Sequence, residues 1–570
     1  MTLPAPLPAQ RNAADPHKSF FVMANAGSGK TTVLVDRIVR LMLQGSEPST
    51  IQCLTYTKAA AVEMIERLRQ RLRVLVMFDD DLLIKELARL TGSPPTDDMI
   101  IRARQLFSNV LEQPGPYIET IHGFAQRLLA LFPEEAGLPA GSRLANENEL
   151  RDINMRADQQ LFQHIKNMKG GEEACAYFEA RHGASTLFTL IRHLQPKNAA
   201  EMPTAASVDE MQRINFDQKL QDFLEAIKDH KGKKTQQFFQ VGQDYCCNKY
   251  PLSHLTRLFL TKAGQPLKSL AKDIDNDFFA LQDLFMSLLS QEVLAQLGKE
   301  HADLKRLGAL RQLLWEKEKE KQSVIDFDDL IHYAQHLLGQ ASDKDFVRWV
   351  LDGKINHLML DEAQDTSLPA WNIISILMED IFHAPEGKTV FVVGDVKQSI
   401  YGFQGASPES FIDVRNHFID RKIYPYSSAQ NQALPVSFRS SKPILEFVDA
   451  LFQDPATAEK IAGLGGDVHH ELFMGDAPGR VDLWPLPSLQ QPPESDPWSD
   501  PVNRYARISP AVILCQELAE WLSGQLSAEH PECGGPQLRP KDVFILFRKR
   551  GALLREMTRA LHAKNIPCSG

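Results

Sequence analysis

The chain has 570 residues and a formal net charge of −10, with 43% hydrophobic and 24% charged residues. This composition excludes a wholly disordered chain, and the length predicts about three or four domains rather than one core. The sequence contains no apolar run of about 18 residues and no signal-peptide pattern, so we expect no membrane contact and a cytoplasmic location. The net acidity gives no general attraction for nucleic acid, so any such binding requires local basic and aromatic patches.

Strands and helices alternate along the first part of the chain. We predict strands at residues 19–23, 51–55 and 117–121 with helical periodicity between them, which indicates a parallel α/β sheet. Leucine-rich helical patterns take over at residues 136–324 and indicate a large helical insertion, whose charged run at 316–321 we interpret as a solvated helix face. Strands return at 355–360 and 389–393, and a further α/β unit with a strand at 542–548 begins near residue 434.

The first predicted strand leads into a glycine-rich loop that opens a helix. This loop is composed of Ala24, Asn25, Ala26, Gly27, Ser28, Gly29, Lys30 and Thr31. Its glycines allow backbone N–H groups to turn toward a phosphate, the helix start adds the positive end of a dipole, and Lys30 adds a point charge for the β- and γ-phosphates. Thr31 offers a hydroxyl to Mg²⁺. The pattern predicts a site for a nucleoside triphosphate, although Ala24 stands where this motif usually has glycine.

A second acidic element follows the predicted strand at 355–360. Asp361 and Glu362 come directly after this strand, at the sheet edge where ligands of parallel α/β sheets bind. We expect Asp361 to hold Mg²⁺ and Glu362 to orient and deprotonate the water that attacks the γ-phosphate. Taken alone, the pair would favour an acidic loop after a strand; together with the phosphate loop it favours the catalytic interpretation.

The sequence Asp-Glu-Ala-Gln-Asp at 361–365, combined with the glycine-rich loop, resembles the UvrD/Rep group of superfamily 1 DNA helicases. Further elements follow in that family's order: Gln10, then residues 55–67, 119–124, 394–406 and 434–440. The resemblance implies two RecA-like motor domains, with 1–135 and 325–430 forming the first, 136–324 inserted in it, and 431–570 beginning an incomplete second. Within the family the chain is most similar to the AddA branch, the helicase–nuclease subunits of bacterial AddAB complexes, which implies an AddB-like partner.

The resemblance also assigns roles to residues outside the two acidic and phosphate-binding elements. It implies that the Gln10 amide recognises the adenine edge and that Gln398 senses the γ-phosphate. It implies that Arg439 reaches the γ-phosphate as an arginine finger, since its fork can spread charge over the transferring group. Phe438 stacks on adenine in this interpretation, where the family more often has tyrosine.

A track for single-stranded DNA is expected from aromatic and basic residues in the same motifs. Aromatic faces stack on unpaired bases without sequence preference, and the candidates are Tyr56, His122, Tyr401 and Phe403. Lys58 and Arg67 are candidates for backbone phosphates. An aromatic residue after a strand is also common in a core, which is the alternative for these positions. Gln404 stands where many relatives carry arginine.

These features together predict an ATP-dependent DNA helicase that acts on single-stranded and duplex DNA in double-strand break repair, with ATP and Mg²⁺ at the motor site. The 3′-to-5′ polarity comes from the resemblance alone. The chain stops before the last family motifs, V and VI, which suggests a C-terminally truncated sequence. One alternative is therefore a nucleotide-gated DNA-binding subunit without turnover. A small-molecule P-loop kinase is a weaker alternative, because it leaves the aromatic motifs unexplained.

Overall fold

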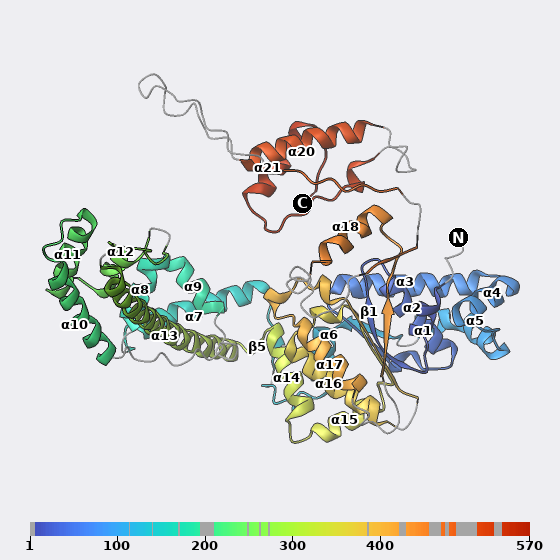
Figure 1. Ribbon diagram of the computed structural model, residues 1–570. Helices are drawn as coiled ribbons and strands as arrows, with labels where there is room; N and C mark the ends of the chain where they lie inside the picture. Colours follow the sequence, from blue (N-terminus) through green and yellow to red (C-terminus); the bar gives the residue numbers. More distant parts are fainter. Residues whose placement is uncertain are drawn as a thin grey trace. The chain divides into compact units, whose positions relative to one another are not determined.

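Six parallel strands form the central sheet of the computed structural model (Figure 1). Their order is β3-β2-β6-β7-β1-β8, and every neighbouring pair runs parallel. The strands are β1 (Ser19–Ala24), β2 (Ile51–Thr55), β3 (Tyr117–Thr120), β6 (His357–Leu360), β7 (Thr389–Gly394) and β8 (Ala429–Leu434). The predicted α/β fold class with a parallel sheet is confirmed.

The structure describes residues 6–112, 115–139, 141–168, 171–193, 210–247, 250–261, 264–271, 274–384, 387–420, 429–454, 469–473, 478–485, 510–528 and 538–569. The chain divides into two units, one comprising Met1–Leu138 with Asp328–Gly570 and the other Pro139–Phe327. Among the described residues, no helix combines the length and apolarity needed to cross a membrane.

The central strands β1, β6 and β7 are buried because they are largely apolar, whereas the edge strand β8 carries polar residues and is partly exposed. Alternate side chains such as Phe20, Val22, Cys53 and Phe391 enter one core with the helices on that face. Phe21, on the opposite face, is equally buried. Up to residue 454, the helices that the structure describes in this unit are α1 (Pro8–Ala13), α2 (Lys30–Leu43), α3 (Lys58–Met77), α4 (Asp80–Thr91), α5 (Asp97–Glu112), α6 (Ile121–Leu131), α14 (Phe327–Gly339), α15 (Lys344–Asp352), α16 (Leu368–His383), α17 (Pro408–Asp420) and α18 (Lys442–Phe452).

The predicted strands of this sheet lie where we expected them, with ends that differ by no more than two residues. The sheet also contains a strand that was not predicted, β8, which pairs with β1 over its whole length. The predicted domain boundary at 430/431 therefore falls inside a strand of the first sheet. A two-stranded parallel pair, β9 (Val436–Ser437) with β10 (Glu471–Leu472), comes next. The wider division into four segments stays a prediction.

The second unit is almost entirely helical, with α13 (Asp275–Lys321) running through it. The first half of α13 packs into one apolar cluster and its second half into another. Its other elements are β4 (Arg143–Leu144), α7 (Glu147–Ile165), α8 (Gly171–His182), α9 (Ala184–His193), α10 (Glu210–Ile227), α11 (Lys233–Cys246), α12 (Thr256–Phe259) and β5 (Val324–Ile325). The expectation of a solvated run at 316–321 is wrong in part. Lys319 and Glu318 are buried, since Lys319 pairs with Asp326 at 3.0 Å.

The strand predicted at 542–548 is not formed. Helices α20 (Pro510–Ser527) and α21 (Ala552–Ala563) share a small apolar cluster, and Val543, Ile545 and Phe547 pack against it. Phe544 and Leu546 alternate with them and are exposed. The alternation of a strand is therefore present, but no described strand pairs with this segment. A strand requires a partner for its backbone hydrogen bonds, which the local sequence pattern does not reveal.

Candidate nucleotide and nucleic-acid site

The glycine-rich loop connects β1 to α2 at the carboxyl edge of the sheet. Gly27 and Gly29 have φ values of 74° and 81°, a region in which glycine is unstrained. A side chain at Gly27 would also collide with the segment that follows β8, because a Cβ there would lie 2.8 Å from the Cβ of Arg439. Lys30 begins α2, as expected for a phosphate loop. The predicted strand, loop and helix are thus in register.

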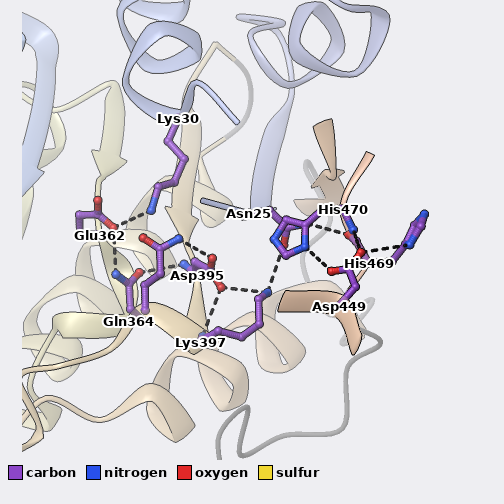
Figure 2. Close-up of polar contacts among 10 residues, drawn as sticks. Asn25, Lys30, Glu362, Gln364, Asp395, Lys397, Asp449, His469 and His470 are labelled. Atoms are coloured by element: carbon purple, nitrogen blue, oxygen red, sulfur yellow. Dashed lines mark hydrogen bonds and ion pairs between the residues drawn. The ribbon is translucent and has the colours of Figure 1, made fainter. Parts of the chain in front are cut away.

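Lys30, at the end of the glycine-rich loop, forms an ion pair with Glu362, which lies just after β6. The Nζ of Lys30 lies 2.8 Å from the Oε2 of Glu362, and the lysine side chain is only 11% exposed (Figure 2). Glu362 has a φ of 51°, which is unfavourable for a residue with a side chain. Backbone strain of this kind costs about 1–3 kcal/mol and persists where the surroundings impose it. The strained residue is the one that the sequence assigns as general base.

Asp361 lies at the end of β6 and is buried. Its pKa is raised to about 6, because burial penalises the charged form and because Glu362 repels it. The backbone N–H of Glu362 donates to its Oδ1 over 3.0 Å. A buried carboxylate without a full counter-charge is a suitable ligand for a hard cation. Thr31, the other predicted metal ligand, lies in the first turn of α2.

Gln364 connects the acidic element to the turn after β7. It is 1% exposed, its Nε2 donates to Glu362 Oε2 over 2.9 Å, and its Oε1 accepts the N–H of Asp395 over 2.9 Å. The Asp395 carboxylate in turn accepts from Gln398 Nε2 over 2.6 Å and pairs with Lys397 Nζ at 3.0 Å. Figure 2 shows this series of contacts running from Lys30 to Lys397. Gln398, the predicted sensor, is therefore connected to Glu362, the predicted general base, through Asp395 and Gln364.

The residues that follow β9 lie against the glycine-rich loop. The N–H of Phe438 donates to the carbonyl O of Gly27 over 2.9 Å, and the ring of Phe438 lies 4.5 Å from that of Phe473. Arg439 follows and is exposed, and no described side chain forms an ion pair with it. The predicted arginine finger is thus adjacent to the loop that would hold the phosphates.

Gln10 also reaches the glycine-rich loop. Its Nε2 donates to the carbonyl O of Ser28 over 2.9 Å, and its Oε1 accepts from the N–H of Leu7 over 3.0 Å. The amide predicted to read adenine is engaged with the backbone in this structure. The buried hydroxyls of Ser28 and Ser437 have no described hydrogen-bond partner. Unpaired buried hydroxyls beside a glycine-rich cradle fit a site that receives a polar ligand.

Three of the predicted DNA-contacting aromatic residues form one row. The ring centroids of Tyr56 and Tyr401 are 4.6 Å apart, and those of Tyr401 and Phe403 are 6.1 Å apart. Phe403 is 80% exposed, so the core alternative does not hold for it. The Tyr56 hydroxyl donates to Gln404 Oε1 over 2.5 Å. Gln404, which stands where many relatives carry arginine, therefore accepts a hydrogen bond from Tyr56, the first ring of the row.

The other three DNA candidates lie on helices next to the sheet. His122 is in the first turn of α6, and its pKa is lowered mainly by burial. Lys58 begins α3 and is exposed. Arg67 lies further along α3 and pairs with Glu63 at 2.6 Å. Their contacts with nucleic acid stay predictions.

Comparison with known proteins gives the family. The profile of the UvrD/REP helicase N-terminal domain matches residues 7–419, which is most of the chain. The chain belongs to the UvrD/REP helicase family. It is 26% identical to an ATP-dependent helicase/nuclease subunit of Lactobacillus gasseri over 81% of its length, and 24% identical to the subunit of the same name from Acetivibrio thermocellus over 76%. The chain spans 41% and 38% of these two relatives, respectively.

Membership of the UvrD/REP family carries ATP use with a divalent metal as a general property, and the resemblance noted in the sequence is thereby confirmed. The individual site assignments stay predictions. The sequence interpretation did not select Gln364, Asp395 or Lys397, although all three lie in the quoted motifs. The signal that could have found them is their position directly after β6 and β7, where polar side chains of a parallel sheet converge.

Proposed function

We propose that this chain carries the ATP-driven motor of a DNA helicase that translocates 3′ to 5′ along single-stranded DNA and opens duplex DNA during double-strand break repair. The observation that supports this most directly is the ion pair of Lys30 with Glu362, beside buried Asp361 and next to Arg439. In this proposal Lys30 binds phosphate and Glu362 is the general base. Asp361 is a metal ligand, and Arg439 supplies positive charge to the transferring phosphoryl group.

The contacts of Glu362 indicate how nucleotide binding would activate it. In this structure its Oε2 accepts from both Lys30 and Gln364. Phosphates bound in the loop would draw Lys30 away, which leaves the Glu362 carboxylate free of its cation and oriented by Gln364. A carboxylate without a paired cation is a stronger base toward a water aligned with the γ-phosphate. Asp361 and Thr31 would hold Mg²⁺, whose charge would neutralise the β- and γ-phosphate oxygens.

Arg439 would complete the site when the two motor segments close. It is the second residue after β9, and Phe438, which lies between them, is hydrogen-bonded to the loop through its backbone. Phe438 and Gln10 would contact the adenine. The row of Tyr56, Tyr401 and Phe403 would stack on unpaired bases, while Lys58, Arg67 and His122 would contact the strand nearby. Tyr401 and Phe403 share the turn after β7 with Gln398, so ATP state and DNA grip would change together.

The names of the relatives support a partner and a larger protein. Each is named as one subunit of an ATP-dependent helicase/nuclease, which implies a complex with another subunit. We propose an AddB-like protein as that partner and a cytoplasmic site of action. The alternative, a nucleotide-gated DNA-binding subunit, predicts that the chain binds ATP but does not hydrolyse it.

ATP hydrolysis with and without single-stranded oligo(dT) tests the proposal. We expect oligo(dT) to raise turnover at least several-fold, and Lys30→Ala or Glu362→Gln to lower it by about 10²–10⁴-fold, the usual contribution of a general base. Glu409→Gln, which neutralises an exposed carboxylate in the first turn of α17, is the matched control and should not change turnover. Binding of ATP without turnover in the unmodified protein would support the gated alternative and contradict the motor.

A further inference from the structure

Lys397 connects two elements that the proposed mechanism treats separately. Its Nζ pairs with Asp395 Oδ1 at 3.0 Å and donates to Asn25 Oδ1 over 3.1 Å. Asp395 is 2% exposed, whereas Lys397 retains 23% of its side-chain exposure. The lysine therefore supplies the charge that balances a buried carboxylate, and it also contacts the second residue of the phosphate loop.

Asn25 carries the connection onward to the next motor segment. Its Nδ2 donates to the carbonyl O of His469 over 2.8 Å, and its backbone N–H donates to the carbonyl O of Leu434 over 3.2 Å. Figure 2 shows Asn25 between Lys397 on one side and the residues around His469 on the other. We call the contacts from Lys397 to Asn25 and from Asn25 to His469 the Asn25 bridge. Both polar atoms of the Asn25 side chain are used in it.

The far end of the Asn25 bridge lies next to β10, the partner strand of β9, and β9 ends two residues before Arg439. His469 lies two residues before β10, and β10 pairs with β9, which ends at Ser437. The same end is held by His470, whose Nδ1 lies 2.5 Å from Asp449 Oδ1 on α18. The strand pair next to the arginine is thus held to the phosphate loop by the Asn25 bridge, in addition to the bond of the Phe438 N–H to Gly27.

We propose that Lys397 is a positioning residue that holds the Arg439 strand pair to the phosphate loop through Asn25. It touches no reacting atom; it fixes Asn25, which fixes the backbone at His469. Loss of its ammonium would leave Asp395 buried without a cation and free one end of Asn25. Movement of the phosphate loop on nucleotide binding would then reach β9 through the bond of the Phe438 N–H to Gly27, but would no longer reach β10 through His469. This inference rests on the proposed nucleotide site, but not on turnover.

Amide hydrogen exchange with and without ATPγS tests the inference, because it follows each element separately. In the unmodified protein we expect ATPγS to slow exchange both in the glycine-rich loop, residues 24–31, and in residues 469–473. In Lys397→Met we expect protection of the loop alone, with exchange at 469–473 at least about fivefold faster than in the unmodified protein with ATPγS. Lys397→Arg, which keeps the charge, should restore most of the protection.

Lys388→Met is the matched control. Lys388 directly precedes β7 at its opposite end and bonds to Asp352, so it also loses an ion pair in this variant. Exchange in Lys388→Met should match that of the unmodified protein at both elements. The inference is overturned if Lys397→Met keeps ATPγS protection at 469–473, or if Lys388→Met loses it equally. Failure of the motor proposal is distinguishable, because it would be seen as absent ATP turnover with exchange protection intact.

Discussion

The phosphate-binding end of the site and the aromatic row are built in opposite ways. Around the glycine-rich loop, Asp361, Gln364 and Asp395 are almost fully buried, and Glu362 is held in a strained backbone conformation. In the aromatic row, Phe403 is 80% exposed and the neighbouring Ile400 is 70% exposed. Hydrolysis requires groups fixed to a fraction of an ångström, which burial and hydrogen bonds provide. A grip on any DNA sequence requires accessible ring faces instead.

Gln364 offers the strongest test of the buried end. Gln364→Leu removes the donor to Glu362 and leaves the Asp395 N–H buried without an acceptor, which costs about 1–3 kcal/mol. We expect DNA-stimulated turnover to fall about tenfold and the free energy of unfolding in urea to fall by about 1–3 kcal/mol. Gln312→Leu, whose amide bonds only to Glu316 along α13, should change neither. Unchanged turnover in Gln364→Leu would show that Glu362 needs no such orientation.

Tyr401→Ala tests the exposed end. Removal of the central ring of the row should weaken single-stranded DNA binding by about 1–3 kcal/mol, or roughly 5- to 150-fold in Kd, measured by fluorescence anisotropy with labelled oligo(dT). Stability should change little, since the row lies on the surface. Phe346→Ala removes another half-exposed aromatic ring, on α15, and serves as the control. Equal Kd values for the two variants would remove the row from the DNA site.

His357 shows what a buried polar group does away from the site. Burial lowers its pKa to about 4, and its ring nitrogens contact Ser46 and Thr389 hydroxyls at 3.1 and 2.9 Å. The unfolded chain binds a proton near pH 6.5, so the stabilisation present above that pH is lost as the pH falls from 6.5 toward 4. At pH 5 the loss is about 2 kcal/mol at 1.36 kcal/mol per pKa unit.

The His357→Asn variant isolates this effect. Its free energy of unfolding should depend less steeply on pH between 6.5 and 4 than that of the unmodified protein, as measured by urea titration at several pH values. DNA binding by the folded variant at pH 7 should be unchanged. Parallel pH dependences for the two proteins would mean that His357 is not the group that titrates.

Tyr56→Phe should have the smallest effect. It removes the hydroxyl that donates to Gln404 but keeps the ring that contacts Tyr401. A solvent-accessible hydrogen bond contributes about 0.5–1.5 kcal/mol, so we expect a rise in the single-stranded DNA Kd of about two- to tenfold. Gln404→Leu should give a similar rise, and the double variant no further one. Additive effects would show that the two residues act independently.

The buried end was largely predictable from sequence, because a glycine-rich loop and an acidic pair each follow an apolar strand. What the sequence did not reveal are contacts between distant residues. Gln364 lies 31 residues from Asp395, and the buried Lys319 pairs with Asp326, which lies beyond the end of its helix, as well as with Glu316. The segment at 542–548 has the alternation of a strand, yet strand formation depends on a partner that local sequence cannot supply.

The most direct test of the link between the two ends is the effect of nucleotide on DNA affinity. The Kd for oligo(dT) should be measured with and without ATPγS, together with the Kd for ATPγS with and without oligo(dT). A motor in which both ends share the turn after β7 predicts that each ligand changes the affinity of the other by the same factor, at least about fivefold. Equal DNA affinities with and without ATPγS would contradict the account, because the phosphate site and the aromatic row would then be independent.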